Sequence, residues 1–356
     1  MIELKDDKLV YTFPDTTTPG ARLVISFVRT LRVPDDGKSY PLPPGLGKFP
    51  LEHVDDYRQR LPQSWIEHGG VMLPLYQSEA LWINFTSSYI EEHAARYPFA
   101  VKVAAGKINA VNGESWSNSL SRDPQDYMVV PGQPWLDGYS VDKECIRQFV
   151  AMPLGKGYSA EGQITGREDA GGLQIAVYPM KKEAFEKRWP RRKTAAVVSE
   201  CVAVKFSMMD DGMGLAGGGR IHQEIYEDCF KLSEWDPTAS SRCFVHLANS
   251  QTWRDITGNT PPTKAPSARE YSSHGLPWFE YYSDQKPLPG SHVLHKLKSV
   301  IQPGKEKREN PLPENDSVEP GHIIAINRPQ SPERVREWPE QNRYERTSGP
   351  DGPGDD

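Results

Sequence analysis

Apolar and polar residues alternate along several stretches of the first 250 residues, as they do in half-buried β-strands. Leu23, Ile25 and Phe27 fall on one side of such a stretch, and Ser26 and Thr30 fall on the other. Residues 99–111 hold two apolar runs around a short turn, which predicts a β-hairpin. Further strands are predicted at residues 80–85, 127–131, 146–152, 173–178, 201–208 and 243–248.

Helices are predicted to be fewer and shorter than strands, at residues 51–60, 86–96, 181–189 and 221–229. Because these helices do not alternate regularly with the strands, the pattern favours an α+β fold with a mainly antiparallel β-sheet core and long loops. A doubly wound parallel sheet is disfavoured for the same reason.

Residues 1–302 are predicted to form a single large β-rich domain. A subdomain joint near residues 121–133 is an alternative, because Pro124, Pro131 and Gly132 lie there. Charged residues, Pro, Gly, Asn and Ser dominate residues 303–356. We expect this stretch to be a disordered polar tail, because it cannot bury enough apolar surface to offset the entropy lost on ordering.

Gly212, Gly214 and Gly217 fit the Gly-x-Gly-x-x-Gly spacing of dinucleotide-binding proteins. That motif follows a strand buried on both faces and opens a helix. Residues 201–208 instead alternate between apolar and polar, and two more glycines stand where the helix would begin. The sequence therefore predicts a mobile glycine loop at residues 212–220 rather than a nucleotide site.

An enzyme or a nucleotide- or anion-binding protein remains the alternative. In that interpretation Gly214, Gly217 and Arg220 hold an anionic group, and His222 or Glu224 carries a proton. A helix over residues 221–229 would place His222 and Glu224 on different sides, so an amphipathic helix with a solvated charged face is the simpler explanation.

Other catalytic patterns are missing from the sequence. It contains no Gly-x-Ser-x-Gly elbow, no phosphate loop and no His-Glu-x-x-His motif. His292 and His295 are spaced to share a metal ion on a helix, but no third ligand stands beside them, so no metal site is predicted. The sequence does not identify a cofactor or decide whether the protein is an enzyme.

The formal net charge of −6 gives no general attraction to nucleic acid or to an anionic membrane. A basic run at Lys187–Lys193 could contact phosphates or direct nuclear import, although a solvated helix end explains it more simply. The charged first residues do not match a secretory signal, and no apolar stretch of about 20 residues occurs. We therefore expect a soluble protein of the cytoplasm or nucleus, with nucleic acid an unlikely partner and no membrane partner.

Aromatic residues gather in loop-rich segments, at Trp135, Tyr139, Tyr158, Trp278, Tyr281 and Tyr282. Such clusters line pockets and interfaces, and they also occur in cores. Together with the missing catalytic motifs, they favour a binding or scaffold protein for an unidentified small molecule or protein partner. Trp135 and Trp278 are the candidate ligand contacts.

Two blocks of the sequence suggest a family resemblance. The first block carries Gln133-Pro134-Trp135-Leu136-Asp137-Gly138, residues 146–155 and residues 171–175, and the second carries residues 223–228 and 275–279. Over most of residues 20–315 the chain resembles a family of uncharacterised soluble proteins from bacteria and fungi. The resemblance implies no activity, cofactor or catalytic residue.

Overall fold

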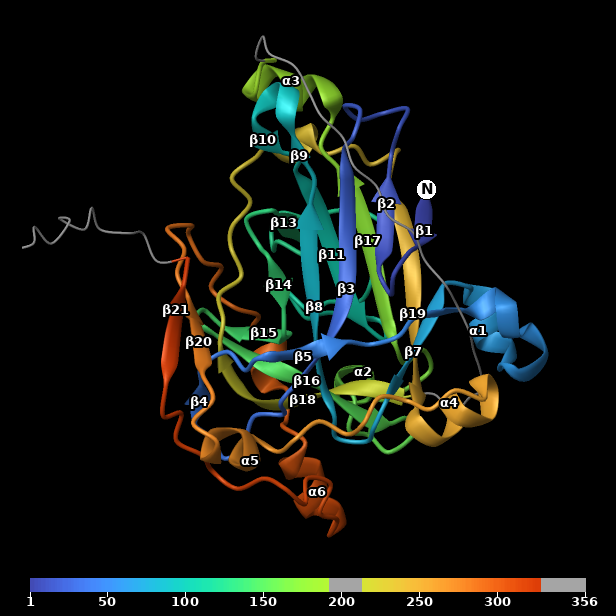
Figure 1. The fold of residues 1–356 in the computed structure, drawn as a ribbon, viewed down its shortest axis with the longest axis vertical. Helices are drawn as coiled ribbons and strands as arrows, with labels where there is room; N and C mark the ends of the chain where they lie inside the picture. The colour runs from blue at the N-terminus through green and yellow to red at the C-terminus, as the bar shows by residue number, and fades with distance from the viewer. Residues whose placement is uncertain (192–212, 328–356) are drawn as a thin grey trace, which may run out of the picture.

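Two β-sheets packed against each other form the body of the protein. The computed structural model describes residues 1–191 and 213–327. The long strands of both sheets run through the centre, with β3 and β8 of one sheet next to β11 and β17 of the other (Figure 1). The predicted α+β fold with a mainly antiparallel sheet core is confirmed.

The larger sheet has ten strands among the described residues, seven of them in the order β1-β2-β3-β8-β16-β18-β4. Their bounds are β1 Ile2–Leu4, β2 Leu9–Thr12, β3 Arg22–Thr30, β8 Ala80–Ser87, β16 Cys145–Pro153, β18 Met213–His222 and β4 Ser39–Tyr40. Three short strands attach at the side, namely β5 Gly45–Lys48, β14 Trp135–Leu136 and β15 Gly138–Asp142. Among the described strands of this sheet, only β18 and β4 pair in parallel.

The second sheet has seven strands among the described residues. They are β12 Ile108–Asn109, β11 Phe99–Ala105, β17 Leu173–Pro179, β19 Ser241–Asn249, β7 Val71–Leu75 and β6 Glu52–His53, with β13 Met128–Val130 beside β11. Strands β11 and β12 form the predicted hairpin. Two small sheets pair β9 Tyr89–Ile90 with β10 Ala95–Arg96, and β20 Trp278–Tyr281 with β21 Ile323–Ile326.

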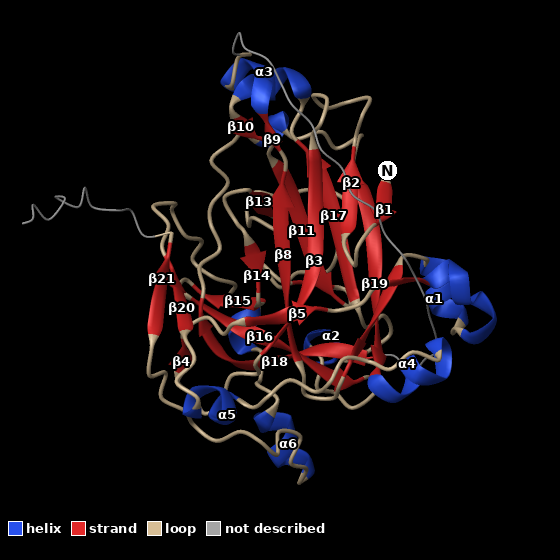
Figure 2. Cartoon of the chain, in the orientation of Figure 1, coloured by secondary structure: helices blue, strands red, loops and turns tan. Residues whose placement is uncertain are grey.

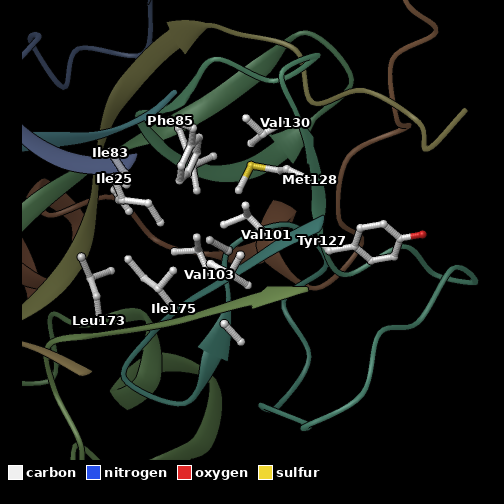
Figure 3. Close-up of a cluster of buried hydrophobic side chains, with 14 of the residues drawn as sticks. Ile25, Ile83, Phe85, Val101, Val103, Tyr127, Met128, Val130, Leu173 and Ile175 are labelled. Atoms are coloured by element: carbon white, nitrogen blue, oxygen red, sulfur yellow. The ribbon is translucent and has the colours of Figure 1, made fainter. Parts of the chain in front are cut away.

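The main core lies between the two large sheets. Ile25 and Ile83 of one sheet face Val101 and Ile175 of the other, and all four side chains are fully buried (Figure 3). These positions are the apolar half of the alternation seen in the sequence. Burying such a side chain stabilises the fold by about 1.5–3 kcal/mol, so this face sets the strand register.

Helices are short and most lie at the periphery of the sheets (Figure 2). The α-helices are α1 Gln63–His68, α2 Ala160–Thr165, α3 Lys182–Arg188, α4 Ser250–Thr257, α5 Ala268–Ser273 and α6 Ile301–Lys307. The 3₁₀ helices are η1 Val54–Arg60, η2 Glu91–His93, η3 Leu232–Glu234 and η4 Leu294–Lys296. Within the described part of the chain, no helix is long and apolar enough to cross a membrane.

Two helices predicted before residue 100 differ from the structure. The helix predicted over residues 86–96 is wrong, because β8 continues to Ser87 opposite Leu23 and the chain then forms the β9–β10 hairpin. Pairing with β3 outweighs the local helical preference here. The helix predicted at residues 51–60 is a 3₁₀ helix that begins at Val54. The strand predicted at residues 201–208 lies outside the described residues.

The structure describes residues 303–327, at the start of the predicted tail, and residues 121–133, at the alternative subdomain joint. Residues 303–327 are part of the packed structure, since they contain the end of α6, the buried Leu312 and Val318, and strand β21. Residues 328–356 lie outside the described part. Each large sheet contains strands from before and after residues 121–133.

Candidate ligand pocket

The glycine-rich stretch is a strand and not a loop. Residues 213–222 form β18, which pairs antiparallel with β16, placing Gly214 opposite Met152 and Gly217 opposite Phe149. Residue 212 is outside the described part of the chain. The prediction of a glycine loop over residues 212–220 is therefore wrong for the residues that the structure describes.

The glycines of β18 allow other segments to pack directly onto the strand. A Cβ atom at Gly214 would lie 2.7 Å from Leu154 Cδ2, and one at Gly217 would lie 3.0 Å from Leu297 Cδ2. Both glycines are buried, and their backbone groups take part in a β-ladder instead of facing a phosphate. The structure thus places the two predicted ligand-binding glycines in the core.

Beyond β18 the chain stays extended, so the helix predicted over residues 221–229 is also wrong. In extended backbone, alternate side chains point to the same side. Ile221, Gln223 and Ile225 are buried, whereas His222 and Glu224 both reach a pocket on the surface. The extended conformation brings together the two candidate proton carriers that a helix would have separated.

This pocket, which we call the acidic pocket, has a volume of about 390 Å³. That is within the range of small-molecule sites. It lies where β14, the end of β18 and β20 meet, and Figure 1 shows β20 and β21 beside this part of the larger sheet. Its lining consists of Leu42, Gln133, Pro134, Trp135, Glu144, His222, Gln223, Glu224, Tyr226, Glu280, Tyr281, Tyr282 and Ser283.

Aromatic rings form one corner of the acidic pocket. The rings of Trp135 and Tyr281 meet edge to face, with centroids 4.9 Å apart and an interplanar angle of 71°. Trp82 packs edge-on against the other side of Trp135, at 5.6 Å. The Tyr281 hydroxyl accepts a hydrogen bond from Asn327 at 3.3 Å. This packing holds two rings at an angle, with Tyr282 beside them.

Carboxylates supply the charge of the acidic pocket. Glu144, Glu224 and Glu280 line it, and no lysine or arginine occurs among its described lining residues. The pKa of Glu224 is raised, first by burial and then by the nearby Glu144 carboxylate, while Lys143 and a hydrogen bond from Tyr226 oppose the rise. Burial raises the pKa of the Tyr226 hydroxyl to about 12. The pocket is thus acidic and partly desolvated.

A buried glutamine fixes two walls of the pocket to each other. The Gln133 amide donates to the carbonyl oxygens of Trp135 at 3.1 Å and Glu224 at 3.2 Å, and its Oε1 accepts from the Tyr226 N–H at 3.3 Å. Only 3% of Gln133 is exposed. Since a buried side chain here completes the backbone hydrogen bonds of two segments, the acidic pocket is pre-formed.

A second pair of buried polar groups lies behind the pocket wall. The Asp137 N–H donates to Gln223 Oε1 at 3.0 Å. Asp137 Oδ1 and Gln223 Nε2 have no hydrogen-bond partner within the described part of the chain. Burial alone raises the pKa of Asp137 to about 8. The wall therefore contains a carboxyl group that is neutral at pH 7 and a neighbouring amide with unused hydrogen-bonding capacity.

The remaining predicted site residues lie elsewhere. Trp278 is 0% exposed and packs between Tyr40 and Tyr271, so it anchors β20 instead of offering a surface to a ligand. The Arg220 side chain lies outside the pocket lining, with Nε 3.2 Å from Cys145 Sγ and a guanidinium nitrogen 3.7 Å from Asp142. Of the candidate site residues, Trp135, His222 and Glu224 line the acidic pocket, together with Tyr281 and Tyr282 from the aromatic group noted in the sequence.

Part of the basic run is paired with acids. Arg188 binds Glu234 through two contacts of 3.0 and 2.8 Å and covers the Phe230 ring at 4.9 Å, while Arg191 lies 3.3 Å from Glu92. Residues 192 and 193 lie outside the described part. Among the residues described, no group of three or more His, Cys, Asp or Glu side chains could hold a metal ion.

Several lining residues were not predicted from the sequence. Glu144, Glu280 and Tyr226 come from three distant segments, and no local motif connects them. If Ile221–Tyr226 had been interpreted as extended chain with alternating sides, Tyr226 would have been placed on the same side as His222 and Glu224. No comparable pattern in the sequence points to Glu144 or Glu280.

Comparison with known proteins does not identify the chain. No protein-family model, curated protein or solved structure matches it. The resemblance to the bacterial and fungal family therefore stays a prediction.

Proposed function

We propose that this protein binds a small organic cation in the acidic pocket. The observation that carries the proposal is the combination of three glutamates with a fixed corner of aromatic rings in one preformed cavity. Aromatic faces attract ammonium groups by about 0.5–2 kcal/mol each, and carboxylates add the complementary charge. The sequence predicts a binding or scaffold function, and cation binding is a more specific version of it.

The enzyme and anion-binding alternative receives less support. The glycines and Arg220 that would hold an anion are apart from the pocket, and the pocket itself is acidic. His222 and Glu224 do share the cavity, so acid–base chemistry on a bound cation remains compatible with the arrangement. Any such chemistry would first require the cation to bind.

We also propose that the protein is located in the cytoplasm or nucleus. Cys145, Cys229 and Cys243, the cysteines within the described part of the chain, form no disulfide, which suits a reducing compartment. Fractionation of cells that express the full chain would test the predicted cytoplasmic or nuclear location.

Calorimetric titration with choline tests the proposed function, using 3,3-dimethylbutan-1-ol as a neutral probe of the same shape. We expect choline to bind and the neutral alcohol to bind at least about tenfold more weakly, because it lacks the charge. Glu224→Gln should weaken choline binding by about tenfold while the chain stays folded. Glu183→Gln, at an exposed position of helix α3, is the matched control and should leave binding unchanged.

The pH dependence gives a further check. The choline affinity should fall as the pH drops through the raised pKa of Glu224, since protonation removes the carboxylate charge. The fall should begin at a higher pH than an ordinary glutamate would give. Equal binding of choline and the alcohol, or an unchanged affinity in Glu224→Gln, would contradict the proposal.

A further inference from the structure

A second cavity of about 490 Å³ lies between α2, η4 and α6, which pack next to strands β15 and β18 of the larger sheet. We call it the lysine groove. Its lining consists of Lys156, Gly157, Gln163, Ile164, Val293, Lys296, Leu297, Lys298, Pro303, Glu306 and Lys307. The groove shares no residue with the acidic pocket.

The rim of the lysine groove carries a local excess of positive charge. Four lysines and one glutamate line it, in a protein with a formal net charge of −6. Lys298 pairs with Glu306 at 2.5 Å, and the Lys307 ammonium lies 3.9 Å from the centroid of the Tyr158 ring. Lys156 and Lys296 are exposed and have no acidic partner within 4.0 Å among the described residues.

Two acids behind the groove are already engaged with other groups. Glu168 accepts hydrogen bonds from the Gly157 N–H at 3.0 Å and from the Ser159 hydroxyl at 2.5 Å. Glu309 accepts a hydrogen bond from the Tyr158 hydroxyl at 2.7 Å. Neither acid lines the groove, so the positive charge of Lys156 and Lys296 remains on its rim.

The floor of the groove is apolar and held in place. Ile164, Val293 and Leu297 contribute to it, and Val293 is 37% exposed. The Gln163 amide donates to the Lys298 carbonyl at 3.1 Å, and its Oε1 accepts from the Lys298 N–H at 2.8 Å. This two-way bridge joins α2 to the segment after η4, so the two walls of the groove keep a defined spacing.

We propose that the lysine groove is a second binding site, which takes a small amphiphilic carboxylate such as a medium-chain fatty acid. The apolar floor contacts the hydrocarbon chain, and Lys156 and Lys296 bind the carboxylate. The occupant is anionic because the unpaired charges of the rim are cationic, and it has an apolar body because the floor offers few hydrogen-bonding groups. This proposal goes beyond the cation site and does not depend on it.

Titration of the full chain with octanoate tests this inference, with 1-octanol and octylammonium as neutral and oppositely charged probes. We expect octanoate to bind most tightly of the three. The double variant Lys156→Glu/Lys296→Glu should weaken octanoate binding by about tenfold or more, because it places like charges against the carboxylate. The variant Lys38→Glu/Lys187→Glu makes the same change in net charge at exposed lysines outside the groove and should bind octanoate as the wild type does.

Three results would overturn the inference. They are no binding of octanoate, equal binding of octanoate and octanol, and equal loss of octanoate binding in both double variants. A fourth check uses the acidic pocket, since Glu224→Gln should leave the octanoate affinity unchanged. A thermal melt of each variant establishes that it is folded, so that a loss of binding reports on the groove.

Discussion

The acidic pocket and the lysine groove both combine apolar surface with charge. The charge is negative in the pocket and positive in the groove. The acidic pocket sets Glu144, Glu224 and Glu280 against aromatic rings, whereas the lysine groove sets lysines against aliphatic side chains. Both lie on the same sheet-built body. The difference indicates that the chemistry of each site comes from loop and strand-end side chains, while the sheets only position them.

Both sites contain a glutamine side chain that joins two backbone segments, and the two glutamines differ in burial. In each, one glutamine bridges two backbone segments, namely Gln133 in the acidic pocket and Gln163 in the lysine groove. Gln133 is buried and Gln163 is only partly buried. The hydrogen bonds of Gln133 should therefore stabilise the fold more than those of Gln163, because water cannot replace them at the buried site.

The largest effect is expected at Asp137, which has no counterpart in the lysine groove. Its pKa is raised from 3.8 to about 8, so the unfolded state ionises from about pH 4 and the folded state does not until about pH 8. The stability of the wild type should fall as the pH rises through this window. At 1.36 kcal/mol per pKa unit, the full effect has an upper limit of roughly 6 kcal/mol.

Asp137→Asn removes this titration. Below pH 4 the variant should have a free energy of unfolding close to or below that of the wild type, and above pH 8 it should be the more stable protein. Urea unfolding at pH 4, 6 and 8.5 measures the difference. A difference that does not change with pH would show that Asp137 ionises as readily in the folded state as in the unfolded state.

The next effect separates the two sites by charge. Glu224→Lys should weaken choline binding by about 100-fold or more, because it replaces an attraction by a repulsion inside the cavity. It should leave octanoate binding at the lysine groove unchanged. Parallel titrations with both probes on one preparation measure the two affinities. If both affinities fall together, the two sites are not independent.

The glutamine bridges give a smaller effect, on stability. Gln133→Ala should lower the free energy of unfolding by about 2 kcal/mol, because it leaves buried backbone groups without partners. Gln163→Ala should cost about 1 kcal/mol or less, since water reaches its site. Denaturant unfolding of the two variants provides the comparison. An equal loss in both would contradict the role of burial proposed here.

Salt should produce the smallest effect. A rise from about 0.1 M to 1 M salt shortens the screening length from about 10 Å to about 3 Å. We expect the octanoate affinity, measured relative to that of octanol, to fall by about threefold, because Lys156 and Lys296 are exposed. The choline affinity should fall less, by about twofold or under, because Glu224 is partly buried. The reverse order would indicate that choline binds at the open surface.

Strand prediction succeeded where the alternation of side chains matched the final burial. The strands predicted around Ile25, Ile83, Val101 and Ile175 are present, because one face of each packs in the main core. Prediction failed at Gly214 and Gly217, where the lack of side chains removed the alternation itself. Their place in β18 follows from pairing with β16 and from the close approach of Leu154 and Leu297.

The amino-acid sequence by itself determined the class of fold, through the period-two burial pattern, and it singled out Trp135, His222 and Glu224 as polar or aromatic candidates. Only the tertiary structure decided that these three side chains line one cavity with Glu144 and Glu280. It also decided that Lys156 and Lys296 face a common groove. The reason is physical: strand formation depends on patterns within a few residues, whereas a site depends on contacts between segments that lie far apart in the sequence.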